Sequence, residues 1–186
     1  MDNILRIYTD GGCRGNERGK ANVGGYGAVL TYKDHKKELS GGARDTTNNR
    51  MEMCALIAAL EAVNKPAQTI EVHSDSAYLI DCLAKKWYVS WKKKGWITSA
   101  KKPVENQDLW ERILELIDGH HMSYVKIKGH VDLGKPSTNV DALYKKFIER
   151  NGSGLSKDEF LVSLKMNSRV DELANLVLET LTTRTQ

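Results

Sequence analysis

The order of strand-like and helix-like segments limits the fold of this 186-residue chain more than any other feature of its sequence. Apolar periodicity predicts three strands near the N-terminus, followed by two further strands that alternate with helices. The strands are expected at residues 4–8, 26–32, 37–41, 69–74 and 123–127. Helices are expected from the capping cluster at 46–49 to about 63, and at about 76–83, 105–117 and 168–180. This order predicts an α/β protein with one mixed sheet on which the helices pack.

Composition places the chain among ordinary globular proteins, with 40% hydrophobic and 28% charged residues. No apolar run approaches the roughly 20 residues that span a bilayer, and the N-terminus lacks the pattern of a secretory leader. The three cysteines, Cys13, Cys54 and Cys82, are widely spaced and form no CxxC pair. A disulfide framework or a zinc site is therefore not expected, and we expect a cytoplasmic protein without a membrane partner.

One stretch of the chain, residues 85–102, is strongly basic and rich in aromatic residues, although the net charge of the whole chain is only +4. Its basic residues are Lys85, Lys86, Lys92, Lys93, Lys94, Lys101 and Lys102, its aromatic residues are Trp87, Tyr88, Trp91 and Trp96, and it contains no acid. Lysines that neutralise backbone phosphates give sequence-independent, salt-sensitive binding of nucleic acid. The tryptophans either pack against a sugar edge or anchor the segment to the protein. A solvated basic face is the alternative.

Four carboxylates lie where strands end or helices begin, namely Asp10, Glu52, Asp75 and Asp171. Open α/β sheets build their sites at such positions. Each residue also has a structural explanation. Asp10 can serve in a turn, Glu52 can close a capping box with Asn49, and Asp75 and Asp171 can cap the helices that begin beside them. The two interpretations are compatible, because one carboxylate can both cap a helix and bind a metal.

The residue strings around these carboxylates follow a characteristic order. They are Tyr8-Thr9-Asp10-Gly11-Gly12-Cys13, Thr46-Thr47-Asn48-Asn49-Arg50-Met51-Glu52, Ser74-Asp75-Ser76, Lys128-Gly129-His130 and Asn167-Ser168-Arg169-Val170-Asp171-Glu172-Leu173-Ala174. The series resembles the successive signatures of the bacterial ribonuclease HI family. The resemblance covers nearly the whole chain except about 30 residues between Leu133 and Met166. It implies a ribonuclease H-like fold, in which a five-stranded mixed sheet carries helices on both faces.

The resemblance also implies an activity and a metal site. Asp10, Glu52, Asp75 and Asp171 would bind two Mg²⁺ ions, for which Mn²⁺ can substitute. Mg²⁺ prefers oxygen ligands, and two ions about 4 Å apart clamp an in-line displacement at phosphorus. The enzyme would cut the RNA strand of RNA–DNA hybrids and leave 5′-phosphate and 3′-hydroxyl ends. His130 would assist proton transfer or product release, and a monomer is expected to act on the hybrid.

Further positions match the family's nucleic-acid contacts. By resemblance, Cys13, Asn16, Asn48 and Asn49 follow the RNA strand, where 2′-hydroxyls distinguish RNA from DNA. Thr47 and Asn106 match two members of a DNA-phosphate pocket. Some relatives have an arginine two residues before this threonine, whereas this chain has Asp45, which puts the third pocket contact in doubt. The basic stretch, including Trp87, Trp91, Lys92, Lys93, Lys94, Trp96, Lys101 and Lys102, would grip the DNA strand.

The chain departs from the family between His130 and the last aspartate, which are usually about ten residues apart. Asp141 lies nearer to that spacing, but only Asp171 has the Asn167 partner and the following Glu-Leu-Ala string, so we assign Asp171. We interpret the whole chain, 1–186, as a single domain in which about 134–166 form an inserted helical hairpin. The hairpin is either a surface elaboration or a lid or substrate contact. Its first helix is expected to stop at Asn151-Gly152. A capping box of Ser156 and Glu159 predicts the start of a second helix that runs to about Lys165. The first helix carries an apolar stripe of Val140, Leu143, Tyr144, Phe147 and Ile148.

Three other functions are weighed. Integrase-like and resolvase-like enzymes of the same fold lack the basic stretch and the Thr-Thr-Asn-Asn-Arg-Met-Glu string. A hybrid-binding module without activity would tolerate loss of the carboxylates, yet all four are present. A domain derived from a reverse transcriptase would be expected to follow a polymerase, whereas this sequence opens directly on the first strand.

Overall fold

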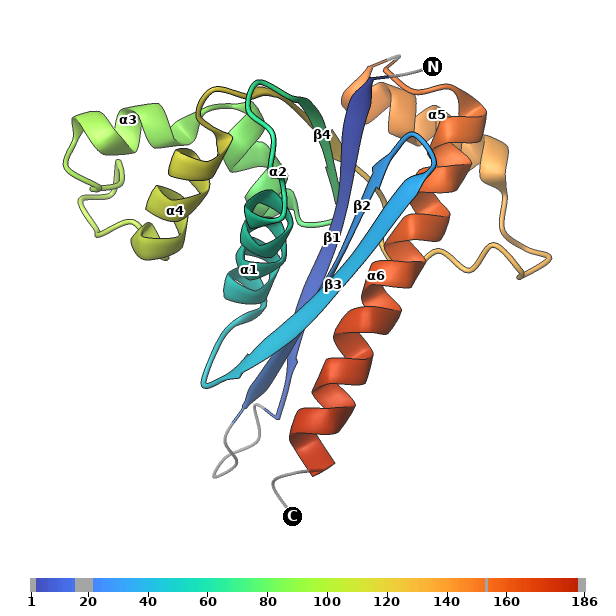
Figure 1. Ribbon diagram of the computed structural model, residues 1–186, viewed down its shortest axis with the longest axis horizontal. Coiled ribbons are helices and arrows are strands. Elements are labelled where there is room, and N and C mark those ends of the chain that lie inside the picture. Colours follow the sequence, from blue (N-terminus) through green and yellow to red (C-terminus); the bar gives the residue numbers. More distant parts are fainter. Residues whose placement is uncertain (1–2, 16–21, 153, 184–186) are drawn as a thin grey trace.

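A computed structural model describes residues 3–15, 22–152 and 154–183, and a five-stranded mixed sheet forms its centre (Figure 1). The strands are β1 (Ile4–Arg14), β2 (Val23–Tyr32), β3 (His35–Arg44), β4 (Thr69–Ser74) and β5 (His121–Lys126). Their spatial order is β3-β2-β1-β4-β5. The first three strands are antiparallel neighbours, and β4 and β5 run parallel to β1. The expected mixed sheet is confirmed.

Helices cover both faces of this sheet (Figure 1). One face carries α1 (Asn48–Glu61), α2 (Ala77–Ala84), α3 (Trp87–Lys93) and α4 (Gln107–Ile117), and the other carries α6 (Lys157–Thr183). Successive side chains of a strand point to opposite faces. Ile7 therefore joins the core beneath α1 with Leu56 and Trp110, while Tyr8 packs against Val170 of α6. In the described part of the chain, no helix combines the length and the apolar character needed to cross a membrane.

The strands around the first carboxylate are longer than the sequence suggests. The sequence predicted strands at 4–8 and 26–32, but β1 continues to Arg14 and β2 begins at Val23. The glycines serve a close approach rather than a turn. A Cβ on Gly27 would lie 2.3 Å from the backbone oxygen of Val170, so only glycine lets α6 pack this closely on β2. The turn between β2 and β3 is also tighter than expected, because β3 begins at His35.

The last helix differs from the expectation more clearly. The structure has one continuous helix, α6, where the sequence predicted a helix ending near Lys165 and another beginning near Ser168. The expected start of the first segment is correct, because Ser156 and Glu159 exchange hydrogen bonds as a capping box. No break follows because Ser168 does not cap a new helix, and its hydroxyl instead donates to the Leu164 carbonyl at 3.3 Å. The helical hairpin predicted at about 134–166 therefore corresponds to α5 and the first part of α6.

The helix α5 (Val140–Asn151) covers the outer edge of β5. The Asn151 side chain accepts from the Lys126 amide and donates to the Lys126 carbonyl, both at 2.8 Å. Arg150 forms an ion pair with Asp81 of α2 at 2.6 Å. The apolar stripe of α5 packs with the start of α6, and Phe147 and Phe160 lie 4.9 Å apart between ring centroids. The helix α5 thereby covers the edge strand β5, whose free edge would otherwise be exposed.

Replacing Ser168 by proline should lower the free energy of unfolding by about 3 kcal/mol or more, because proline inside a helix removes a hydrogen bond and clashes with the preceding turn. Had a helix begun at this position, proline would be tolerated in its first turn. The matched control is Ser168→Ala, which removes the same hydroxyl and keeps the backbone. Urea unfolding of both variants measures the difference, and equal stabilities would contradict a continuous α6.

Candidate active site

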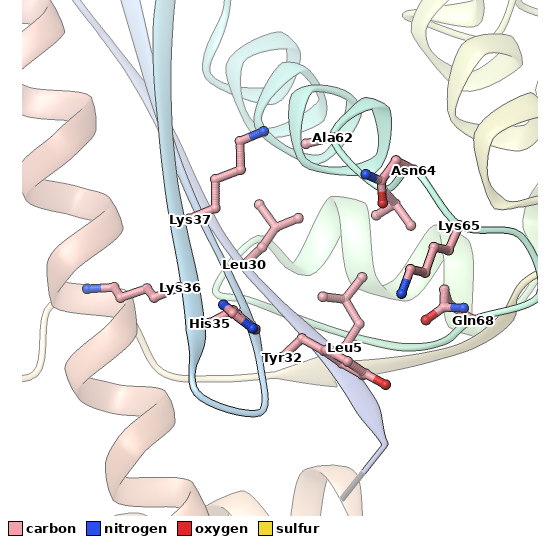
Figure 2. Close-up of a pocket in the computed structure, with 11 residues that line it drawn as sticks. Leu5, Leu30, Tyr32, His35, Lys36, Lys37, Ala62, Asn64, Lys65 and Gln68 are labelled. Atoms are coloured by element: carbon pink, nitrogen blue, oxygen red, sulfur yellow. The ribbon is translucent and has the colours of Figure 1, made fainter.

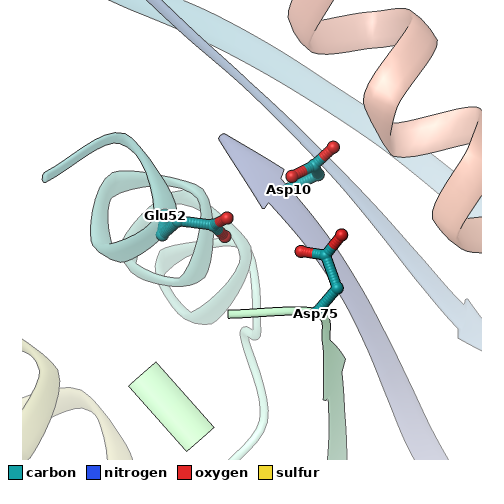
Figure 3. Close-up of side chains that lie close together, drawn as sticks. All are labelled: Asp10, Glu52 and Asp75. Carbon is teal, nitrogen blue, oxygen red and sulfur yellow. The ribbon is translucent and has the colours of Figure 1, made fainter. Parts of the chain in front are cut away.

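Three of the predicted carboxylates converge at the end of the parallel strands. Thr9 of β1 pairs with Ser74 of β4, so Asp10 and Asp75, one residue further along each chain, become neighbours. Glu52 reaches them from α1, which packs on β1 (Figure 3). Oxygen atoms from the three side chains all lie within 4.8 Å of one another. Strand register and helix packing together thus build an acidic cluster, as the sequence predicted.

The structural explanations considered for these carboxylates do not hold. Thr47 is the N-cap of α1 and accepts from the Arg50 amide, so Asn49 and Glu52 form no capping box. Ser76 rather than Asp75 caps α2. Asp10 lies within β1, not in a turn. Capping and turn formation therefore do not explain why these three residues lie together.

Asp171 and His130 lie beside this cluster. Both line the same hollow as Asp10, Glu52 and Asp75, and His130 Nδ1 is 4.0 Å from Asp171 Oδ1. Asp171 lies in the middle of α6 rather than in a first turn, and it is not part of the tight group of three. Its competitor Asp141 is exposed near the start of α5 and pairs with Lys157. The structure therefore brings Asp171, not Asp141, to the site.

The carboxylates of this cluster repel one another, and this repulsion changes their pKa values. Burial, followed by the charges of Asp75 and Asp171, raises the pKa of Asp10 to about 7. Burial and the neighbouring Asp10 raise the pKa of Glu52 well above its usual range. Burial likewise raises the pKa of Asp75, although Lys126 and His130 oppose this shift. Carboxylates that repel one another in a buried place favour either protons or a bound cation.

These residues fit a divalent cation of the hard type. All the donors are carboxylate oxygens, which Mg²⁺ and Mn²⁺ prefer. Asp10 and Glu52 are each only 7% exposed, and Glu52 Oε2 is buried without a hydrogen-bond partner among the described residues. A buried, unpartnered carboxylate oxygen that faces two other carboxylates is what an oxygen-binding cation would satisfy.

In the metal-free protein, the free energy of unfolding should fall as pH rises from 5 to 8. The folded state keeps the Asp10 proton up to about pH 7, whereas the unfolded chain releases it near pH 4, so stability is lost between these values. The expected loss is roughly 2–3 kcal/mol. Urea unfolding in EDTA measures it, with Asp10→Asn as the reference in which the Asp10 contribution is absent. A wild-type profile parallel to that of the variant would contradict the prediction.

Three neighbours of the cluster were not assigned from the sequence. Asn167 of α6 is buried and hydrogen-bonds to Asp75. Lys126 lies opposite Ser74 in the sheet, and its charge lowers the pKa of Asp75. A Cβ on Gly129 would lie 1.8 Å from Asp75 Oδ2, so a larger residue there would displace the Asp75 carboxylate. The strand register is the signal for Lys126, because parallel neighbours end side by side.

The predicted RNA-strand contacts lie next to the carboxylates. Cys13 and Asn48 line the same hollow, and Asn49 follows in the first turn of α1. Asn16 lies outside the described residues.

Arg50 contacts both residues of the predicted DNA-phosphate pocket, Thr47 and Asn106. The Arg50 amide donates to Thr47 Oγ1 at 3.2 Å, and its guanidinium is 3.4 Å from Asn106 Oδ1. Asp108 fixes the guanidinium through two hydrogen bonds of 3.0 and 2.7 Å. Arg50, which the sequence did not single out, therefore places a guanidinium, paired with Asp108, beside Thr47 and Asn106.

The basic stretch forms α3 and the loop that follows it. Trp91 packs 5.8 Å from Trp110 and 6.4 Å from Trp96 between ring centroids, so these rings anchor the segment to the core. Trp87 is exposed, and Lys85 lies over its ring. Lys92, Lys93, Lys94, Lys101 and Lys102 are all exposed. Of the two roles considered for the tryptophans, anchoring describes Trp91 and Trp96, and only Trp87 is free to meet a ligand.

Another hollow lies away from these residues, near the start of β1 (Figure 2). Leu5, Leu30, Tyr32 and Lys65 are among its lining residues, which include no carboxylate. Its chemistry offers no acid, base or metal ligand set comparable to that around Asp10. We therefore place the chemistry at the carboxylates.

Comparisons with known proteins agree with this geometry. The chain matches the family model of RNase H over residues 2–149. It is 50% identical over 127 residues to a ribonuclease H of Clostridium botulinum, covering 68% of this chain and 83% of the relative. A ribonuclease H of Thermoanaerobacter sp. is 43% identical over 148 residues, covering 80% and 92%. The fold is similar to the crystal structure of LC11-RNase H1 in complex with RNA/DNA hybrid, with a TM-score of 0.59, 21% identity, and 96% and 99% coverage.

The sheet order and the helices on both faces are those of a ribonuclease H-like α/β fold, the fold class expected from the sequence. Because the family model covers most of the chain and two bacterial relatives align with it closely, the chain belongs to the ribonuclease H family. It is a ribonuclease H enzyme, a hydrolase of the nuclease class. The integrase-like, resolvase-like and non-catalytic alternatives are set aside.

Proposed function

We propose that this enzyme hydrolyses the RNA strand of RNA–DNA hybrids as an endonuclease, with two divalent cations held by Asp10, Glu52, Asp75 and Asp171. The observation that carries the proposal is the convergence of Asp10, Glu52 and Asp75 at the end of β1 and β4. Membership of the ribonuclease H family supports it, as does the hybrid bound to a protein of similar fold. The physiological cation is proposed to be Mg²⁺, with Mn²⁺ as a substitute.

Each residue has a defined task in this proposal. When bound, the cations would activate the attacking water and stabilise the leaving oxygen, which gives 5′-phosphate and 3′-hydroxyl ends. The buried Asp10 and Glu52 and the half-buried Asp75 would hold them through carboxylate oxygens, and Asn167 orients Asp75. His130 is 78% exposed at the rim, so its ring can exchange protons with solvent and assist transfer to the product.

Recognition of a hybrid needs different contacts on the two strands. Cys13, Asn48 and Asn49 lie beside the carboxylates, where side-chain and main-chain polar groups can meet 2′-hydroxyls. Thr47 and Asn106, joined by Arg50, would bind a phosphate of the DNA strand. The exposed lysines that follow Trp91 would bind further phosphates without reading sequence.

The chain is proposed to act as a monomeric single domain in the cytoplasm. Cys13, Cys54 and Cys82 are all free in the structure, which suits a reducing compartment.

The deciding experiment compares labelled RNA–DNA hybrid, duplex RNA, duplex DNA and both single strands, with Mg²⁺, with Mn²⁺ and with EDTA. We expect cleavage of the RNA strand in the hybrid only, and only when a divalent cation is present. Cleavage of duplex DNA at a comparable rate, or full activity in EDTA, would refute the proposal.

Replacing Lys92, Lys93 and Lys94 together by alanine should raise KM by about tenfold or more and flatten its dependence on salt, because fewer counterions are released on binding. The maximal rate should hold, since these exposed lysines lie on α3 and just after it, while the carboxylates lie at the end of β1 and β4. Steady-state kinetics between about 50 and 200 mM salt measure both quantities. A collapse of kcat at unchanged KM would show that the segment contributes to chemistry instead.

A further inference from the structure

We propose that the insertion forms a second binding surface for the backbone phosphates of the substrate duplex, separate from the basic stretch at 85–102. We call it the insertion groove, and it lies between the loop that follows His130 and the start of α5. Its lining residues include Lys128, His130, Lys135, Asn139 and Lys146. The inference rests on the proposed function, because it names where the same substrate continues beyond the carboxylates.

The insertion groove is continuous with the active site. His130 lines the hollow that holds the carboxylates, the groove itself, and a neighbouring hollow that reaches Lys165 and Ser168 of α6. A strand that is cut beside Asp10 and passes His130 would therefore enter the groove directly. The volume of about 430 Å³ leaves room for a sugar–phosphate backbone, and three of the lining side chains are lysines that can meet its phosphates.

The lysines of the insertion groove carry positive charge, which complements the phosphates of the proposed substrate duplex. Lys128, Lys135 and Lys146 are exposed, and no ion pair between described residues engages them. One acid, Asp132, also lines the groove, where its Oδ1 accepts the Gly134 amide at 2.9 Å. The neighbouring Asp141 is paired with Lys157, so the lysines outnumber the acids in the groove. Three unpaired ammonium groups that adjoin a phosphodiester-cutting site favour a polyanion, and the substrate is the polyanion that must lie there.

The wall of the groove is rigid, so binding does not need to order it first. The Asn139 side chain caps α5 by accepting from the Ala142 amide at 3.0 Å. The far end of α5 is held by two hydrogen bonds from Asn151 to β5 and by the Arg150–Asp81 ion pair. Phe147 is buried against Phe160. A preformed cationic wall costs little conformational entropy when it binds a duplex.

The insertion groove and the basic stretch lie on opposite sides of the molecule. In Figure 1, α3 lies at one end of the view and α5 and the loop before it at the other, with β1 between them. A duplex held at both places would be fixed on both sides of the cleaved bond. The insertion is then a substrate contact, which selects one of the two roles that the sequence left open.

The test is a double variant, Lys135→Ala with Lys146→Ala, compared with a control of equal charge change, Lys65→Ala with Lys145→Ala. Lys145 is the neighbour of Lys146 on α5 but does not line the groove, and Lys65 lines the distant hollow of Figure 2. All four lysines are exposed, so both variants should fold, which thermal melting verifies.

With a long hybrid at near-physiological salt, the groove variant should show a KM raised about tenfold, with kcat within twofold of wild type. The slope of log(kcat/KM) against log salt should become shallower by roughly 1–2, while the control stays within twofold of wild type. Equal KM values for the groove and control variants would overturn the inference. The same result is expected if the groove binds an acidic protein instead of the substrate. Failure of the wild-type enzyme to cut hybrid would instead refute the proposed function itself.

Discussion

Replacing Asp10 by asparagine is expected to reduce hydrolysis by about a thousandfold or more, while making the metal-free protein more stable at neutral pH. The activity falls because Asp10 is one of the three carboxylates whose oxygen atoms lie within 4.8 Å of one another and would hold the cations. The stability rises because asparagine has nearly the same shape but cannot ionise. The burial and the like charges that raise the Asp10 pKa to about 7 then no longer oppose folding.

Two measurements on one preparation test this prediction. Cleavage of labelled hybrid gives the activity, and urea unfolding in EDTA at pH 8 gives the stability. The matched control is Asp34→Asn, which removes the same charge from an exposed turn between β2 and β3 and should change neither quantity appreciably. A variant that loses activity and also unfolds more easily would mean that Asp10 supports the fold rather than the chemistry.

Most of the architecture follows from local patterns in the sequence, and the differences have tertiary causes. Alternation along β4 and the apolar stripe of α1 are visible in the residues themselves, because each element must bury one face. The length of β1 is not visible, since a glycine-rich segment normally indicates a turn. In the structure, glycine in this region serves close packing instead. The Val170 backbone of α6 approaches Gly27 of β2 too closely for any side chain.

The continuity of α6 was hidden for a related reason. The sequence around Asn167 and Ser168 contains residues that often cap helices, and the expected helices on either side were each of ordinary length. In the structure, Asn167 is buried and turns toward Asp75, and Ser168 bonds back to Leu164. The same two residues would have capped a helix had the site not required Asn167 inside α6.

The candidate site was predicted as a set of residues but not as a geometry. Strand ends and helix starts identified Asp10, Glu52 and Asp75, yet capping remained a sufficient explanation for Glu52 and Asp75 considered singly. In the structure, Thr47 and Ser76 are the N-cap residues of α1 and α2, so capping does not explain Glu52 and Asp75. Lys126 could not be assigned from its own neighbourhood, because its importance comes from the strand that pairs with it.

The choice between Asp171 and Asp141 leads to the second prediction of large effect. The family match ends at residue 149, so Asp141 lies within it and Asp171 beyond it. Geometry therefore decides between them. Asp171 shares the hollow with the carboxylate cluster, and its charge contributes to the raised pKa values of Asp10 and Asp75. Asp141 is 84% exposed and bonds to Lys157.

We expect Asp171→Asn to lose activity by on the order of a hundredfold, because the proposed fourth ligand is lost while the cluster of Asp10, Glu52 and Asp75 remains. Its melting temperature should stay unchanged or rise, since one repelling charge is gone. Asp141→Asn should keep nearly full activity and lose at most about 1 kcal/mol of stability, the usual contribution of an exposed ion pair.

Both variants remove one negative charge, so each is the electrostatic control for the other in hybrid cleavage assays. An inactive Asp141→Asn beside an active Asp171→Asn would mean that α5 carries the fourth ligand and that α6 belongs to an appendage. The 4.0 Å distance between His130 Nδ1 and Asp171 Oδ1 at the rim of the site favours the opposite result.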